Sequence, residues 1–119
     1  MSKLRNKHWA SLIFILAFSL YANTIFNDYN LDDTLVTQNH RLTSKGISAI
    51  PEIFEAFYYE DAMGYKYGYR PITHASFAVE HSLFGESAAV SHTINVFLYA
   101  ITCLLIFLTT EVISSGVRR

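Results

Sequence analysis

Two long apolar segments lie near the two ends of the chain, and a more polar stretch separates them. The first runs from Trp9 to Phe26, 18 residues without a charge. At 1.5 Å rise per residue, this length is near the lower limit for a helix that crosses a bilayer. The second runs from Thr93 to Ile113 and has an uncharged centre. The pattern therefore predicts an all-α membrane protein with two transmembrane helices, residues 9–26 and 93–113, joined by a loop, residues 27–92.

The first part of the loop predicts short amphipathic helices. Residues 28–33 indicate a turn into a short helix, with Asp32 or Asp33 as its N-cap. A second helix is expected with a cap at Ser48 and with Pro51 in its first turn. Its apolar residues recur at helical spacing, so that the helix could lie along the membrane surface; they are Ile47, Ile50, Phe54, Phe57 and Tyr58.

The last part of the loop predicts a third helix, which begins at Pro71 and is ended by Gly85. Its expected apolar stripe is formed by Ile72, Ala75, Ser76, Val79 and Leu83. His74 and His81 share one face but are too far apart for easy joint metal ligation. We interpret them as ordinary hydrogen-bonding histidines.

The segment from Phe57 to Tyr69 is rich in tyrosine and contains Gly64 and Gly68. One interpretation is an aromatic belt at the membrane interface, where amphipathic rings are enriched. The other is a mobile flap with glycine hinges, whose rings stack on a sugar or on a lipid headgroup.

Composition agrees with a membrane protein. The 119 residues leave room for one domain, half of them are hydrophobic, and a soluble domain of this size could hardly bury so many apolar side chains. The net charge of −1 gives no field that favours nucleic acid, so no nucleic-acid partner is expected. The single cysteine, Cys103, lies within an apolar run, has no intrachain partner and indicates a buried thiol.

The distribution of charge predicts the orientation of the spans. Lys3, Arg5 and Lys7 precede the first span, a basic pair ends the chain, and the loop carries four basic and nine acidic residues. Basic flanks stay in the cytoplasm, so residues 1–8 and 114–119 are expected inside and the loop outside. A cleaved signal peptide is the rival interpretation of the basic start, although Leu20-Tyr21-Ala22 makes a poor cleavage site.

One constellation in the loop suggests chemistry. The sequence has no phosphate-binding glycine loop, zinc-ligand spacing or nucleophile elbow. A divalent metal is possible but not indicated, and no cofactor is predicted. Asp32 and Asp33 follow the first span closely, where a carboxylate could take a proton from an incoming hydroxyl. The alternative is that the pair is only a helix cap in a solvated turn.

The order of motifs along the chain resembles the N-terminal part of the GT-C membrane glycosyltransferases. A basic start and one span are followed by Asp32-Asp33, amphipathic helices, Tyr69-Arg70-Pro71, Phe84-Gly85, and His92 with Asn95 and Val96 entering the second span. The resemblance covers residues 11–108. It is closest to the protein O-mannosyltransferase-like members that carry tetratricopeptide repeats at their far end.

The resemblance implies a multi-pass protein of the cell inner membrane that transfers a sugar from a polyprenyl-phosphate donor. In that family an acidic residue of the first outer loop acts as base, which implies Asp32 or Asp33 here. Arg70 would support the loop or pair with the lipid phosphate. Tyr69 and His92 join Arg70 as expected substrate-binding residues.

Two features depart from the family. Tyr99 stands where relatives often have histidine, and the family has many more spans than the two found here. The chain is therefore expected to be an N-terminal fragment that is inactive alone. The alternative is a small two-span membrane protein whose loop outside the membrane binds a partner.

Overall fold

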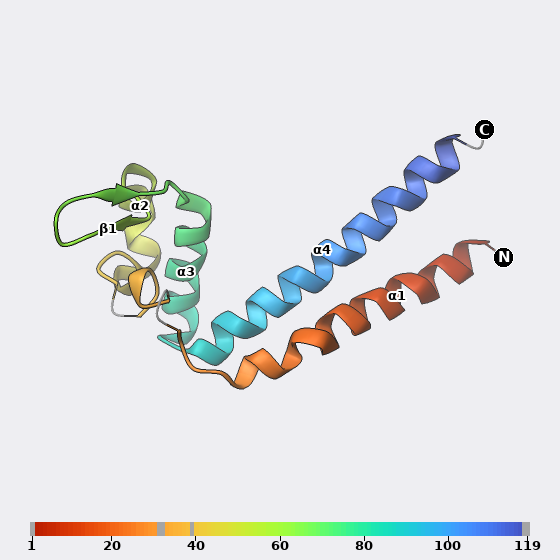
Figure 1. Ribbon diagram of the computed structural model, residues 1–119, viewed down its shortest axis with the longest axis horizontal. Helices are drawn as coiled ribbons and strands as arrows, with labels where there is room; N and C mark the ends of the chain where they lie inside the picture. The colour runs from red at the N-terminus through yellow and green to blue at the C-terminus, as the bar shows by residue number, and fades with distance from the viewer. Residues whose placement is uncertain (1, 31–32, 39, 118–119) are drawn as a thin grey trace. The chain divides into compact units, whose positions relative to one another are not determined.

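The computed structural model describes residues 2–30, 33–38 and 40–117. The chain forms two compact units (Figure 1). The helical unit contains the residues up to Asn27 and from His92 onward, and the loop unit is Asp28–Ser91. The described structure is mostly helical, as the sequence predicted, with one two-stranded hairpin in addition.

The helical unit is formed by one long helix and by the part of a second one that follows Ser91. Helix α1 (Ser2–Tyr21) continues into the 3₁₀ turn η1 (Ala22–Phe26), and α4 spans Ala88–Val117. The segments Lys7–Phe26 and Ala88–Gly116 have mean hydropathies of 1.7 and 2.2, and both are long and apolar enough to cross a membrane. Most of their large apolar side chains are exposed, which is compatible with contact to lipid.

Aromatic rings connect α1 and α4 within this unit. The rings of Phe14 and Phe97 meet edge to face with centroids 5.7 Å apart, and those of Tyr21 and Tyr99 do so at 4.8 Å. Such pairs add to the energy of burial alone. Tyr99 therefore has a packing partner on α1.

The loop unit is built on α3 (Pro71–Phe84), against which η3 (Thr43–Ala49) and α2 (Ile50–Glu55) pack. The predicted bounds of α3 are confirmed. Pro71 occupies its first turn, and the N–H of Gly85 donates to the carbonyl oxygen of His81 at 2.9 Å where the helix ends.

The core of the loop unit is small. It consists of Leu42, Ala49, Ile53 and Ala78, with Ala56 and Ala75 packed against it. The second helix is shorter than predicted, and the residue that it places in this core is Ile53, which is 1% exposed and was not part of the predicted apolar face. Ile47 and Phe54 of that face are 51% and 47% exposed, which is compatible with a face that lies on a membrane surface. This helix ends at Glu55, before Phe57 is reached. The expected cap is wrong, because the Ser48 hydroxyl donates to the carbonyl oxygen of Lys45 instead.

Of the apolar stripe predicted for α3, Ala75 packs against the core of the loop unit, but the large residues at its two ends do not. Ile72 and Leu83 are 79% and 65% exposed, while His74 and Ala78 are buried. The physical reason is that α3 meets η3 through small and polar residues such as Ala78, His74 and Ser82, which the periodicity of apolar positions does not reveal.

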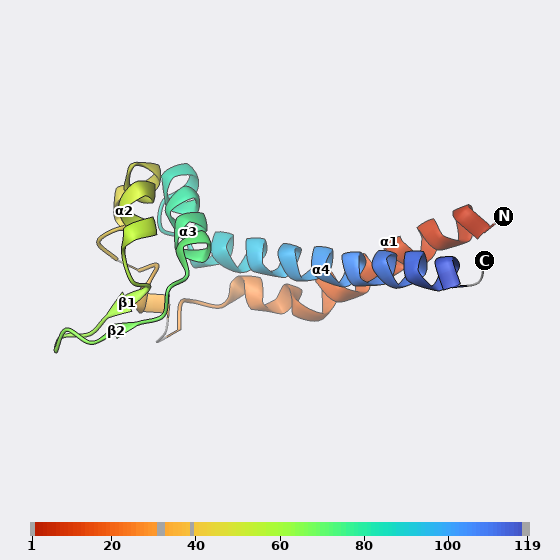
Figure 2. The same cartoon turned by 90° about the horizontal axis from the view of Figure 1, so that it is seen from above.

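A short hairpin, β1 (Tyr59–Glu60) and β2 (Lys66–Tyr67), occupies the tyrosine-rich segment (Figure 2). Asp61 holds its turn, since one carboxylate oxygen accepts the backbone N–H groups of Met63 and Tyr65, both at 2.9 Å. The sequence did not predict these strands, because the segment lacks the alternation of a longer strand.

Candidate functional site

Asp33 is the first residue of the 3₁₀ turn η2 (Asp33–Leu35), and Asp32 lies outside the described residues. The carboxylate of Asp33 accepts the backbone N–H of Asn30 at 2.8 Å, while the N–H of Asp33 donates to the Asn30 carbonyl oxygen at 3.0 Å. Asp33 is therefore not the N-cap that was predicted. Its carboxylate reaches back three residues to Asn30, as the side chain at the N3 position of a capping box reaches back to the N-cap.

Arg70 immediately precedes α3, and its carbonyl oxygen accepts the N–H of His74 at 3.0 Å. Its guanidinium lies over the ring of Tyr58, 5.4 Å from the centroid. A guanidinium stacked in this way keeps its edge N–H groups available for an anion.

Asp33 and Arg70 line the same pocket, which has a volume of about 420 Å³. Its other walls are largely aromatic and aliphatic and are formed by Leu35, Val36, Tyr58, Tyr59, Tyr67, Gly68 and Phe77. Burial raises the pKa of the Tyr58 hydroxyl; the charge of Arg70 opposes this shift and that of Asp33 reinforces it. One carboxylate and one guanidinium thus meet in a partly apolar cavity, the composition of many small-molecule sites.

The other two predicted site residues do not join them in this pocket. The hydroxyl of Tyr69 donates to the carbonyl oxygen of Phe54 at 2.7 Å, which fastens the segment before α3 to α2. His92 belongs to the helical unit, and within the described part of the chain its buried Nε2 atom has no hydrogen-bond partner.

A buried polar cluster escaped the sequence analysis. The Nε2 atom of His74 lies 3.2 Å from the Nδ1 atom of His40 and 3.2 Å from the Oγ1 atom of Thr43. His74 is 1% exposed, and this burial, together with the neighbouring His40, lowers its pKa to about 4. His74 is thus a hydrogen-bonding histidine, as predicted. Its partner could not be read from spacing because the contact joins distant parts of the loop.

Among the described residues, no group of three or more His, Cys, Asp or Glu side chains is placed to hold a metal ion. Comparison of the sequence with protein-family models and with curated proteins, and of the structure with solved structures, gave no match.

Proposed function

We propose that this chain is the N-terminal portion of a polytopic glycosyltransferase that uses a polyprenyl-phosphate sugar donor. One structural observation carries this proposal: Asp33 and Arg70 line a single pocket of the loop unit. The resemblance of the sequence singled out both residues separately, one as a base and one as a partner of phosphate.

The two side chains suit the two charges of such a reaction. A carboxylate can take the proton of an acceptor hydroxyl as that oxygen attacks the anomeric carbon. A guanidinium can hold the departing lipid phosphate through charge-assisted hydrogen bonds. In this proposal Asp33 is the base, Arg70 binds the phosphate, and the aromatic walls exclude part of the water.

The proposal places α1 and α4 across the cell inner membrane, with both termini in the cytoplasm and the loop unit outside. The support is the apolar length of both helices and the basic residues that flank them. The donor would then reach the loop unit from the outer leaflet of the bilayer.

The pocket alone is too open to complete the reaction. Arg70 is exposed, and Asp33 is only partly buried. Glycosyl transfer develops positive charge on the sugar and requires a preorganised site that excludes water. We therefore propose that additional membrane spans close the site and that these 119 residues alone do not turn over.

Binding of the donor lipid tests the role of Arg70 without requiring turnover. The 119-residue chain in nanodiscs should bind a polyprenyl phosphate, and Arg70→Gln should weaken this binding about 10-fold or more. Lys45→Gln is the matched control, because it removes one positive charge from a side chain outside the pocket lining. Equal weakening by both variants, or no binding by the parent chain, would contradict the proposal.

Transfer itself tests Asp33. When the proposed additional spans are co-expressed, membranes should transfer sugar from the polyprenyl-phosphate donor, and Asp33→Asn should slow transfer about 10²-fold or more. Full activity of that variant would reduce Asp33 to a turn residue.

A second candidate is a two-span membrane protein whose loop binds a protein partner. Large apolar side chains exposed on the loop unit favour it, among them Phe57, Met63 and Phe84. A photo-crosslinker at Met63 distinguishes the candidates, since it should capture a protein in the second and lipid in the first.

A further inference from the structure

The hydrogen bonds around His40 determine which of its ring nitrogens carries the proton. The hydroxyl of Thr43 donates its only proton to the carbonyl oxygen of Val36 at 2.5 Å, so its oxygen must accept from Nε2 of His74. The backbone N–H groups of Leu42 and Thr43 point at Nδ1 of His40, at 3.3 and 3.5 Å. That nitrogen is therefore an acceptor, and neutral His40 carries its proton on Nε2.

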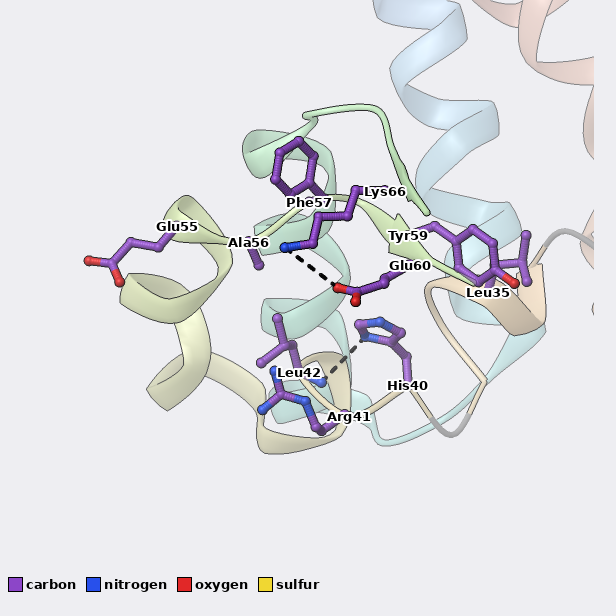
Figure 3. Close-up of a pocket in the computed structure, with 10 residues that line it drawn as sticks. All are labelled: Leu35, His40, Arg41, Leu42, Glu55, Ala56, Phe57, Tyr59, Glu60 and Lys66. Atoms are coloured by element: carbon purple, nitrogen blue, oxygen red, sulfur yellow. Dashed lines mark hydrogen bonds and ion pairs between the residues drawn. The ribbon is translucent and has the colours of Figure 1, made fainter. Parts of the chain in front are cut away.

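His40 lines a second pocket of the loop unit, with a volume of about 460 Å³ (Figure 3). Arg41 belongs to the same wall, and its Nη1 atom is held by Glu52 at 2.6 Å. A guanidinium has five N–H donors, and the imidazole adds a neutral one. This side of the pocket can therefore receive an oxyanion.

A cation site lies in the same pocket, formed by the ring of Phe57 and the carboxylate of Glu60. The ammonium of Lys66 now sits there, 5.3 Å from the ring centroid and 4.0 Å from a carboxylate oxygen (Figure 3). Both charged side chains are about half exposed, so their contact is weak and easily exchanged. A ligand ammonium could replace that of Lys66, whose long side chain could then turn to the ligand's anion.

We propose that this pocket binds a small zwitterion that joins a phosphate to a primary ammonium, the phosphoethanolamine group. The phosphate would be held by His40, Arg41 and Lys66, and the ammonium by Phe57 and Glu60. A fourth charged side chain, Glu55, lines the pocket as well. The lining thus carries both signs of charge, which suits a ligand that joins an anion to an ammonium.

If the loop unit lies at the membrane, as proposed above, the phosphoethanolamine group could belong to a lipid headgroup. The alternative ligand is the free, water-soluble molecule. The pocket is separate from the one that holds Asp33 and Arg70, although Leu35 and Tyr59 line both. Donor-lipid binding and zwitterion binding can therefore fail independently.

Ligand-observed NMR on the full chain tests the proposal. In nanodiscs of phosphatidylcholine alone, soluble O-phosphoethanolamine should bind saturably, and ethanolamine and inorganic phosphate should each bind about 10-fold more weakly or worse. If the headgroup is the source, nanodiscs that contain phosphatidylethanolamine should abolish binding of the soluble probe by occupying the pocket. If the free molecule is the source, binding should persist in them.

Two variants locate the site. Glu60→Gln should weaken binding of the probe about 10-fold or more, because a charged hydrogen bond to the ammonium is lost. His40→Asn should also weaken it, because the asparagine oxygen can replace the Nδ1 acceptor while the Nε2 donor disappears. Asp28→Asn, an exposed acid outside the pocket lining, is the control for the charge change.

The proposal is overturned if the parent chain binds the probe in neither nanodisc. Unchanged binding by Glu60→Gln and His40→Asn would overturn it as well. So would equal binding of serine or of a methyl glycoside, since a site for any zwitterion or for a neutral sugar would then explain the result.

Discussion

Ser82 of α3 and Ile47 of η3 are joined by a hydrogen bond of 2.8 Å, in which the serine hydroxyl accepts the backbone N–H. Gly46 allows this approach, because a Cβ atom at its position would overlap the Ser82 hydroxyl. Gly46 also has φ +65° and ψ −148°, a conformation that essentially only glycine adopts. The contact between η3 and α3 therefore depends on this residue.

Gly46→Ala should destabilise the loop unit by about 2–5 kcal/mol, from backbone strain and overpacking together. Gly85→Ala is the matched control, since Gly85 has φ +72° but nothing within 4 Å of the position that an alanine methyl group would take. Gly85→Ala should reduce the stability of the loop unit by about 1–3 kcal/mol, from backbone strain alone. Amide hydrogen exchange of the loop unit measures both, and equal costs would show that Ser82 can move aside.

The burial of Ile53 of α2 is tested by comparison with Ile47 of η3. Ile53→Ala should destabilise the loop unit by about 2–5 kcal/mol, because it removes a fully buried side chain from a small core. Ile47→Ala changes the same atoms at an exposed position and should cost about 0.5 kcal/mol or less. The reverse order in hydrogen exchange would contradict the burial of Ile53 in the core of the loop unit.

These residues show what the sequence could reveal. Pro71 and Gly85 are local signals, which is why the bounds of α3 could be predicted from them alone. The side of α3 that is buried could not be predicted, because η3 contacts this helix through Gly46 and through the polar pair Thr43 and His74. These residues are not part of an apolar stripe. Apolar periodicity indicates a face, but it does not say whether protein or lipid covers that face.

For the candidate site, too, the sequence did not show which residues lie close together. Asp33 and Arg70 were chosen from short motifs, and nothing in their spacing places them in one pocket. The pairing of His40 with His74 is a long-range contact that only the packing of η3 on α3 creates. Sequence patterns identified reactive side chains, and tertiary structure determined which of them meet.

Acidification should destabilise the loop unit through His74. Its pKa is about 4 in the folded chain and ordinary, near 6.5, in the unfolded one. Between these values the unfolded state binds more protons, so the stability that is complete above pH 6.5 is lost as the pH falls towards 4, by up to about 3 kcal/mol. His40, whose pKa burial also lowers, acts in the same direction.

The comparison of the parent chain with His74→Gln isolates this effect. Burial raises the pKa of Glu80, so its ionisation opposes folding and its contribution to stability has the opposite dependence on pH. Both proteins retain Glu80, and the difference between their stability curves belongs to the histidine. Hydrogen exchange at several pH values measures the free energy of unfolding of the loop unit. On acidification this free energy should fall less steeply for His74→Gln than for the parent chain. Parallel curves for the two proteins would contradict a neutral, buried His74.

Retention of the first span distinguishes it from a signal peptide. The region after it lacks a good cleavage site, so the mature protein should begin at Met1 or Ser2. Intact mass spectrometry of protein purified from membranes measures this directly. A start near Asn23 would show that α1 is removed.

The orientation of the spans is tested by labelling with a membrane-impermeant thiol reagent in intact cells. The native Cys103 is first replaced by alanine, which leaves each introduced cysteine as the only target. Cysteines at Glu60 and Glu86, both exposed in the loop unit, should react, and one at Ser2 should react only after the cells are lysed. The physical reason is the basic N-terminal flank, which is retained in the cytoplasm.

Charge reversal of the basic flank tests whether these residues determine the orientation. Replacing Lys3, Arg5 and Lys7 with glutamate leaves the uncharged segment from Trp9 to Phe26 unchanged. It should increase labelling at Ser2 in intact cells, because the flank then loses the charge that retains it inside. Labelling at Ser2 but not at the loop in the parent chain would reverse the proposed topology. The pocket of Asp33 and Arg70 would then face the cytoplasm, where it could not meet a donor in the outer leaflet.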